Sequence, residues 1–392
     1  MQSAAVRSIG VATVGRSDFG LYEPLLEAIR ADSSLELRLM PSGAHFDPSF
    51  GPTIRDVESL GFDYERGLAL TYASDDPGSF VQALGAGVQR FGVAFERARP
   101  HLLLILGDRL EMLCPAVAAL PWSIPLVHLY GGKVSEGAVD ELVRHALTKM
   151  SHLHFVTCEL HARRLRQMGE EPWRIHNYGS PGLDRMHQAP RATRLEVCTQ
   201  LSLDPGRPFI LVTYHPVTLE TESRGLQLEN FFKALEAYDQ QIAITYPNAD
   251  VGHREVIAFI ERLAASRPRD VRIVKNAGSH LYFDLLAHAA AMAGNSSSGI
   301  AEAPSFELPV VNVGSRQAGF QRAANVIDTG YDAQEISLAI QRAVSGQFRS
   351  ALRGLKNPYG AGRSSARIVE VLRSIPLDAK LLRKRFIDLP AA

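Results

Sequence analysis

The segment SIGVATVGRSDFG, which runs from Ser8 to Gly20, contains the pattern that decides the fold. Its first seven residues form a short apolar run with β-branched side chains, which is typical of a buried strand. A glycine-bearing loop, residues 15–20, follows this run, and a helical pattern then extends from Tyr22 to Arg30. The segment therefore predicts a strand, a loop and a helix in that order.

The same alternation continues along the chain. In the first half, strands are predicted at residues 35–40, 102–106 and 125–129, and helices at 80–98 and 111–120. After a polar stretch, a second series of strands is predicted at residues 209–213, 241–245, 271–275, 291–294 and 310–313. Helices are predicted between them at residues 226–238, 254–266 and 281–288, and from residue 299. Apolar strands interleaved with helices indicate parallel sheets that are covered on both faces.

The 392 residues fit two domains better than one core. We predict an α/β fold of two Rossmann-like, doubly wound domains that face each other across a cleft, residues 1–187 and 188–360. The tail, residues 361–392, has amphipathic helical segments able to cross back onto the first domain. Ligands of open α/β sheets sit at the carboxyl ends of the strands, so the site is expected in the cleft.

Composition narrows the class of protein. The chain has 42 basic and 42 acidic residues and 46% apolar residues, an average balance for a globular protein that does not indicate nucleic-acid binding. Its three cysteines have neither disulfide-framework nor zinc-site spacing. No signal-peptide core and no run of about 20 apolar residues is found, so we expect a cytoplasmic protein without a membrane partner.

The segment GNSSSG, residues 294–299, lies between a predicted strand and a predicted helix. Backbone N–H groups at a helix start, the helix dipole and three hydroxyls suit a diphosphate. An ordinary serine cap with a glycine turn is the structural alternative. Glu302 follows one helical turn later, where a carboxylate can accept both ribose hydroxyls, although it also suits a solvated first turn.

Two further side chains follow the first strand of each half. Arg16 lies in the first strand-to-helix loop, where a guanidinium can bind a phosphate through two hydrogen bonds, although a surface arginine has the same pattern. His215 follows the first strand of the second half. A lone histidine at a strand end is more often structural than catalytic. A functional role for His215 is therefore supported only by the other motifs.

Titratable residues gather near strand ends of the first half. Asp108 follows one buried strand, and His128 ends the next. Asp140, Arg144 and His145 then share a predicted helix, together with Glu141. The structural alternative is an exposed ion pair between Asp140 and Arg144, four residues apart. Shared burial would instead shift their pKa values and suit proton transfer.

Taken together, these motifs resemble the hydrolysing UDP-N-acetylglucosamine 2-epimerase family. The resemblance spans Thr13 to about Asp328 in the family's order, and its most specific segments are LGDRLEM (106–112), HLYGGKVSEGAVDELVRHALTKMSHLHFV (128–156), YHPVTLE (214–220) and GNSSSGIAEAPSF (294–306). It implies a glycosyltransferase-B-like fold and the release of UDP with N-acetylmannosamine, by elimination to a glycal and addition of water. It implies no cofactor and no metal, and a UDP-type nucleotide sugar as the ligand.

The resemblance also assigns residues to roles. The implied catalytic set is Asp108, Asp140, Arg144, His145 and His215. The nucleotide-binding set comprises Arg16, Tyr282, Ser296, Ser297, Ser298, Gly299 and Glu302. We expect the enzyme to form a homodimer or homotetramer and to belong to sialic-acid-type biosynthesis.

Two residues depart from the family pattern at positions expected near the sugar. Tyr130 stands where the family usually has Glu or His, and Lys133 stands where it has Glu. An amine in place of a carboxylate reverses the local charge and removes an acceptor. Alternatives therefore stay open: an enzyme for another nucleotide sugar, such as a diacetamido-trideoxy sugar donor, a hydrolase without epimerisation, or a nucleotide-binding protein that has lost catalysis.

Overall fold

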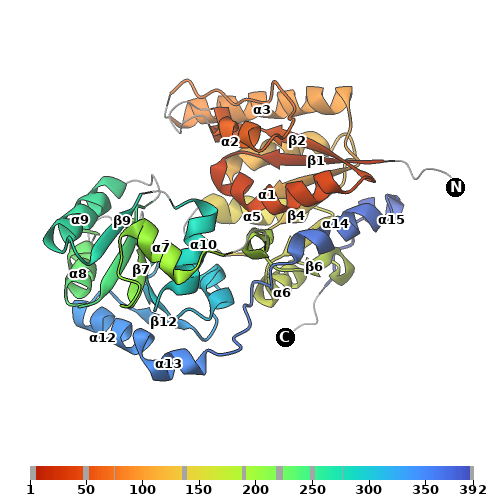
Figure 1. Cartoon of the computed structure of the whole chain (residues 1–392). Helices are drawn as coiled ribbons and strands as arrows, with labels where there is room; N and C mark the ends of the chain where they lie inside the picture. Colours follow the sequence, from red (N-terminus) through yellow and green to blue (C-terminus); the bar gives the residue numbers. More distant parts are fainter. Residues whose placement is uncertain are drawn as a thin grey trace. The chain divides into compact units, whose positions relative to one another are not determined.

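The computed structural model describes residues 6–46, 53–74, 76–134, 139–187, 191–217, 224–247, 252–275 and 277–388. The chain divides into two compact units. Unit 1 comprises Met1–Arg185 and Gly360–Ala392, and unit 2 comprises Met186–Tyr359. The chain therefore leaves unit 1 once and returns to it for its last segment (Figure 1).

Unit 1 contains a six-stranded parallel sheet in the order β2-β1-β3-β4-β5-β6. Its strands are β1 (Arg7–Thr13), β2 (Leu35–Pro41), β3 (Leu102–Leu106), β4 (Leu126–Leu129), β5 (Leu153–Val156) and β6 (Ile175–Asn177). All five residues of β3, LLLIL, are buried, because helices cover both faces of the sheet. This arrangement explains why the central strands have continuous apolar runs instead of alternating ones.

The helices of unit 1 form two layers, with apolar clusters on both sides of the sheet. They are α1 (Arg16–Ala31), α2 (Ile54–Ser59), α3 (Pro77–Arg97), α4 (Leu113–Ala119), α5 (Val139–Met150), α6 (Glu159–Gln167), α14 (Ser364–Ser374) and α15 (Ala379–Leu382). Short 3-10 helices are η1 (Gly43–Phe46), η3 (Leu110–Met112), η4 (Pro172–Arg174) and η5 (Pro181–His187).

The C-terminal helices are part of the core of unit 1. Ile368, Leu372 and Leu381 are buried in the same apolar cluster as the inner face of α1, beside which α14 lies (Figure 1). The Asp184 carboxylate accepts hydrogen bonds from the N–H groups of Ser364 and Ser365, at 2.9 and 2.6 Å, at the start of α14. A carboxylate at this end of a helix is favoured by the helix dipole.

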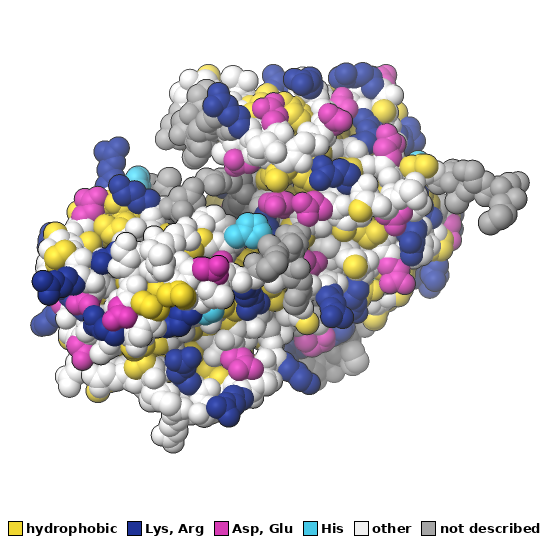
Figure 2. All heavy atoms as spheres, viewed as in Figure 1, with side chains coloured by type: hydrophobic (Ala, Val, Ile, Leu, Met, Phe, Trp, Pro, Cys, Tyr) yellow, Lys and Arg dark blue, Asp and Glu magenta, His cyan; other side chains and the backbone are white. Residues whose placement is uncertain are grey.

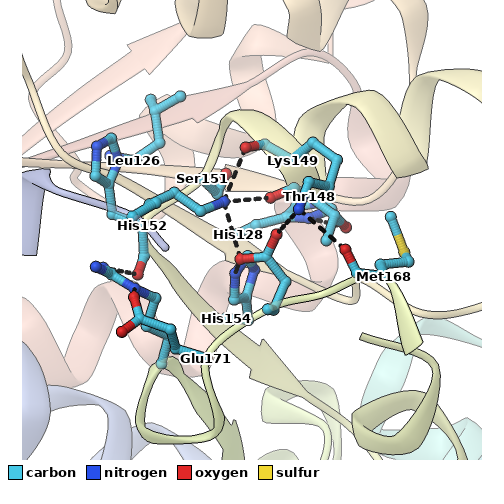
Figure 3. Close-up of polar contacts among 12 residues, drawn as sticks. Leu126, His128, Thr148, Lys149, Ser151, His152, His154, Met168 and Glu171 are labelled. Atoms are coloured by element: carbon cyan, nitrogen blue, oxygen red, sulfur yellow. Dashed lines mark hydrogen bonds and ion pairs between the residues drawn. The ribbon is translucent and has the colours of Figure 1, made fainter. Parts of the chain in front are cut away.

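A buried ion cluster fixes the chain after α15. The Glu170 side chain is fully buried, and its carboxylate accepts hydrogen bonds from Lys149 at 2.7 Å, from His154 at 2.9 Å and from Lys384 at 2.9 Å. Figure 3 labels Lys149 and His154 in this cluster. Burial alone would raise the pKa of Glu170, but hydrogen bonds from these groups lower it to about 2. Lys384 also donates to the Lys149 carbonyl at 2.8 Å. The C-terminal tail is thereby joined to the end of α5.

Arg174 makes a second connection to the tail. Its buried guanidinium donates to the carbonyls of Leu381, Lys380 and Arg383 at 2.8 to 3.0 Å. It also forms an ion pair with Glu171 at 2.7 Å. One arginine thus satisfies several carbonyl groups around the end of α15, where an unpaired buried carbonyl would be costly.

Unit 2 contains a second six-stranded parallel sheet, in the order β12-β11-β10-β7-β8-β9. Its strands are β7 (Phe209–Thr213), β8 (Gln241–Thr245), β9 (Val271–Val274), β10 (Met292–Gly294), β11 (Val310–Val313) and β12 (Val326–Thr329). Its helices are α7 (Arg194–Leu201), α8 (Arg224–Glu236), α9 (His253–Ser266), α10 (Gly278–His288), α11 (Ser298–Ala301), η6 (Ala303–Phe306), α12 (Ala333–Val344) and α13 (Gly346–Ala351).

The predicted α/β class with two Rossmann-like parallel sheets is confirmed. The predicted strands were too few, because β5, β6 and β12 have only three or four residues and interrupted apolar patterns.

Acidic and basic side chains are intermixed over the face shown in Figure 2, in keeping with the charge balance. No helix in the described ranges is both long and apolar enough to span a membrane.

Candidate functional site

The carboxyl end of β3 lies where the strand order of the first sheet reverses, between β1 and β3. Open α/β sheets bind ligands outside such a switch point. The chain leaves β3 through Gly107, whose φ of +73° is a conformation that favours glycine. Asp108 follows immediately and is partly exposed. The fold thus places this predicted acid at the expected position of unit 1.

Arg144 connects helix α5 to this turn. Its guanidinium forms an ion pair with Asp108 and a second one with Glu141 at 2.8 Å, and it donates to the Lys133 carbonyl at 3.2 Å. The Arg144 side chain is only 1% exposed, so these interactions form in a partly desolvated environment. Asp108 and Glu141 are carboxylate partners of Arg144. An ion pair with Asp140, the structural alternative considered from the sequence, is therefore not needed to balance the charge of this buried guanidinium.

Glu141 also holds His145, since its second carboxylate oxygen lies 2.8 Å from His145 Nε2. The Nδ1 atom of His145 is buried without a hydrogen-bond partner among the described residues. A carboxylate on Nε2 orients the imidazole and leaves Nδ1 available for another group. Glu141 was not included in the predicted catalytic set. Its spacing of three and four residues from Arg144 and His145 on one helix is the signal that could have identified it.

Asp140 is the second residue of α5 and is exposed. Partial desolvation raises the pKa of its carboxyl group, and the Asp108 carboxylate raises it further. Two neighbouring carboxyl groups with different environments are suited to divide proton transfer between them. The structure therefore brings Asp108, Asp140, Arg144 and His145 together at the start of α5 and the end of β3.

Tyr130 and Lys133, the two departures from the family pattern, contact each other. Tyr130 has a φ of +65° and its buried hydroxyl lies 2.7 Å from the Ser180 hydroxyl. The Lys133 ammonium lies 4.7 Å from the centre of the Tyr130 ring, within the range of a cation–π interaction. Between them, Gly132 has a φ of +80°, and an added Cβ would lie 2.6 Å from the His161 carbonyl oxygen. The phenol therefore packs into unit 1, and Lys133 is the more accessible of the two.

In unit 2 the strand order reverses between β7 and β10. Gly294 ends β10 with a φ of +136°, and an added Cβ would lie 2.0 Å from the Thr213 carbonyl oxygen at the end of β7. The Asn295 side chain then accepts from the His215 N–H at 2.7 Å and donates to the His215 carbonyl at 2.8 Å. These contacts hold the loops after β7 and β10 together at the switch point.

His215 is buried, and this burial, together with the Arg316 guanidinium, lowers the pKa of its imidazole to about 4. A neutral imidazole can accept or donate one hydrogen bond at physiological pH. Arg316 donates to the Asn295 carbonyl at 3.2 Å, so it lies beside the same loop. The predicted set did not include Arg316, which follows strand β11.

The serine loop precedes helix α11, which has only four residues. Ser297 is exposed, whereas Ser298 is buried. Within this turn the N–H of Ser298 donates to the Ser296 hydroxyl at 3.3 Å, and the N–H of Gly299 donates to the Ser296 carbonyl at 3.1 Å. These two N–H groups are therefore engaged inside the loop.

Tyr282 of α10 lies beside this loop. Burial raises the pKa of its phenol to about 12, although the nearby Ser298, Thr213 and Ser296 hydroxyls oppose the rise. The Glu302 carboxylate adds to the rise, which places it near the same phenol. The residues of the predicted nucleotide set that lie on α10, α11 and their loop are thus neighbours, whereas the side chain of Arg16 lies outside the described residues.

No group of acidic, histidine or cysteine side chains within the described part of the chain could hold a metal ion.

Comparison with protein families and curated sequences gives a consistent result. A family model described as UDP-N-acetylglucosamine 2-epimerase matches residues 27–373. UDP-N,N'-diacetylbacillosamine 2-epimerase (hydrolyzing) of Legionella pneumophila is 37% identical over 97% of this chain and 99% of that protein. The GDP/UDP-N,N'-diacetylbacillosamine 2-epimerase (hydrolyzing) of Campylobacter jejuni is 34% identical over 98% and 99%. UDP-N-acetylglucosamine 2-epimerase of Neisseria meningitidis is 32% identical over 95% and 97%.

Solved structures share the fold. The Neisseria meningitidis UDP-GlcNAc 2-epimerase bound to UDP-GlcNAc superposes with a TM-score of 0.74 at 17% identity, covering 93% of this chain and 99% of that one. The S. aureus MnaA–UDP co-structure also has a TM-score of 0.74, at 18% identity, with coverage of 94% and 96%.

Proposed function

Because the chain belongs to the hydrolysing UDP-N-acetylglucosamine 2-epimerase family and is thus an enzyme acting on a nucleotide sugar, we propose that it converts a UDP-linked 2-acetamido sugar to UDP and the C2 epimer of that sugar. The observation that carries the proposal is the arrangement of Asp108, Asp140, Arg144 and His145 at the switch point of unit 1. These groups supply carboxylates, a buried cation and an oriented imidazole, as proton transfer next to a departing anion requires.

The proposed reaction has two steps. In the first, a base takes the proton from C2 while the C1–O bond breaks and its electron pair leaves with UDP, so that a C1–C2 double bond forms. In the second, the oxygen of water adds to C1, and a proton is delivered to C2 on the opposite face. Asp108 and Asp140 are the proposed proton-transfer residues, because Asp140 has a raised pKa and Arg144 fixes the position of Asp108.

We propose that the nucleotide is bound by unit 2, through Ser296, Ser297 and Ser298 at the diphosphate and Glu302 at the ribose. The location of their loop at the switch point of the second sheet supports this assignment. Arg316 provides a positive charge beside the loop, where it would attract a diphosphate. His215 and Tyr282 are proposed to complete the nucleotide site as neutral hydrogen-bonding groups.

Between two candidate sugars we expect UDP-N,N'-diacetylbacillosamine to be the better substrate. The Legionella and Campylobacter relatives named for that sugar are 37% and 34% identical to this chain. UDP-N-acetylglucosamine is the second candidate, favoured by the Neisseria relative at 32%. The departures from the family pattern at Tyr130 and Lys133 also favour a sugar other than N-acetylglucosamine.

The test is turnover of both sugar nucleotides in deuterated water, followed by NMR. The proposal expects UDP, the 2-epimeric sugar and deuterium at C2. Release of UDP with protium retained at C2 and no epimer would identify a simple hydrolase. Binding of UDP without turnover of either compound would favour a nucleotide-binding protein. A cytoplasmic location, a homodimer or homotetramer, and a role in sialic-acid-type biosynthesis stay predictions.

A further inference from the structure

His128 of β4 joins two elements of the candidate site. Its Nε2 atom lies 2.9 Å from the Gly107 carbonyl oxygen, directly before Asp108, and its Nδ1 atom lies 3.1 Å from the Thr148 hydroxyl on α5. His128 and Thr148 are both fully buried, and Figure 3 shows them adjacent to each other. Thr148 lies one helical turn after Arg144, which forms the ion pair with Asp108.

The partners of His128 select one tautomer. A carbonyl oxygen can only accept, so Nε2 must carry the proton and donate to Gly107. Nδ1 then accepts from the Thr148 hydroxyl. Burial lowers the pKa of His128 to about 3, so the imidazole stays neutral at physiological pH. Because both ring nitrogens are hydrogen-bonded and the ring is uncharged, His128 is suited to hold the Gly107 carbonyl and the Thr148 hydroxyl in fixed positions.

The packing around this contact leaves little room for adjustment. A Cβ added to Gly131 would lie 3.0 Å from the Thr148 hydroxyl oxygen and 3.1 Å from His128 Nδ1, both tighter than ordinary contacts. The end of α5 is also held from outside, since Lys384 donates to the Lys149 carbonyl at 2.8 Å. The turn that carries Asp108 is therefore attached to a helix that is itself fixed.

We propose that His128 and Thr148 are positioning residues for the proton-transfer step: their hydrogen bond holds the Gly107–Asp108 turn against α5, so that Asp108 keeps its place beside Arg144 and Asp140. This inference rests on the proposed function, because it assigns the purpose of the contact to the same reaction. It requires neither His128 nor Thr148 to touch the substrate.

The test replaces Thr148 with valine, which keeps the shape and removes the hydroxyl. Misplacement of a reacting group by about 1 Å can lower the rate about 10²-fold, so we expect kcat to fall about 10- to 100-fold with KM and UDP affinity nearly unchanged. Thr148→Ser keeps the hydroxyl and should restore kcat to within about threefold of the unmodified enzyme. A kcat of Thr148→Val equal to that of the unmodified enzyme would overturn the proposal.

The chain offers a matched control in Thr157, whose hydroxyl lies 2.9 Å from His161 Nδ1 in another fully buried threonine–histidine pair of unit 1. Thr157→Val should lower the Tm by a similar amount but leave kcat close to its original value. Equal losses of kcat in both variants would mean that Thr148 contributes only to general stability, and would reject the positioning role.

Two further measurements separate this inference from the proposed function. In an Asp108→Asn background, Thr148→Val should cause little additional loss, whereas independent, additive losses would contradict action through Asp108. If the unmodified protein turns over neither sugar nucleotide, the proposed function fails, but the geometry is still testable by an NMR titration of the Asp140 carboxyl group. Displacement of Asp108 in Thr148→Val should lower the pKa of Asp140, because the Asp108 carboxylate helps to raise it. An unchanged titration curve would refute the inference.

Discussion

Replacing Glu170 with glutamine removes the one carboxylate that Lys149, His154 and Lys384 share. The amide has nearly the same shape but no charge, so two ammonium groups lose their counter-ion while the packing is preserved. Since Lys384 belongs to the C-terminal tail, we expect the variant to weaken attachment of the tail to unit 1.

The structure allows an estimate of the cost. The pKa of Glu170 in the folded protein is about 2, against an ordinary value of 4.5, which corresponds to about 3 kcal/mol of stability because each tenfold change in proton affinity is about 1.4 kcal/mol. Removal of one partner from a buried pair costs roughly 3–5 kcal/mol in other proteins. Lys149 is 41% exposed and therefore partly screened, so we expect a loss of about 2–3 kcal/mol.

The same pKa predicts how the loss depends on pH. Because the folded-state pKa of Glu170 lies below 4.5, its stabilisation is complete above pH 4.5 and disappears as the pH falls through about 2. The difference in unfolding free energy between the original protein and Glu170→Gln should therefore be constant from pH 7 to pH 5 and decrease below pH 4.5.

Urea unfolding followed by tryptophan fluorescence is the appropriate assay, since both tryptophans of the chain, Trp122 and Trp173, lie in unit 1. Glu159→Gln is the control, because Glu159 pairs with Arg166 at 2.7 Å but is 63% exposed. An exposed pair contributes about 0–1 kcal/mol. The reasoning would be refuted if the two variants lost equal amounts of unfolding free energy. It would also be refuted if the loss in Glu170→Gln stayed the same down to pH 3.

Three other predictions concern the site. Asp108→Asn and Asp140→Asn should each lower kcat about 10²- to 10⁴-fold without changing UDP affinity, and wild-type rates in both would contradict the proposed mechanism. Replacing Ser297 and Ser298 together with alanine should weaken UDP binding by about 1.5–3 kcal/mol for each lost hydrogen bond to phosphate, measured by calorimetry; unchanged affinity would remove these hydroxyls from the nucleotide site. Gly294→Ala should lower the Tm and the UDP affinity together, because its Cβ would meet backbone at 2.0 Å, and a normal Tm would show that the β10 turn can relax.

The sequence predicted the central strands well, because burial on both faces produces unbroken apolar runs. Leu102–Leu106 and Phe209–Thr213 are examples, and each was predicted with its observed bounds. The edge strand β6 (Ile175–Asn177) has three residues and none is buried, so no apolar run distinguishes it from a loop. Its pairing with β5 depends on the rest of the sheet, which local sequence does not encode.

The site residues were predicted as separate groups, but their partners were not. Helical spacing predicts contacts such as the one between Glu141 and Arg144, since both residues lie on one face of α5. The ion pair between Asp108 and Arg144 spans 36 residues and depends on how α5 packs beside β4. A partner at that separation is set by tertiary structure. Helical spacing alone therefore suggested Asp140, four residues before Arg144, as the carboxylate partner of Arg144.

The return of the C-terminal tail to unit 1 has a consequence for protein synthesis. The ribosome makes the first six strands early, but Leu372 and Leu381, which complete the core around α1, emerge only after the whole of unit 2. Until then Arg174 and Glu170 lack the tail groups that they bind in the finished protein. Domains usually fold in the order in which they are synthesised. Here the unit that begins first is completed only after unit 2 has been translated in full. The nascent chain must therefore keep the α1 face of unit 1 from binding other apolar surfaces until α14 and α15 have emerged.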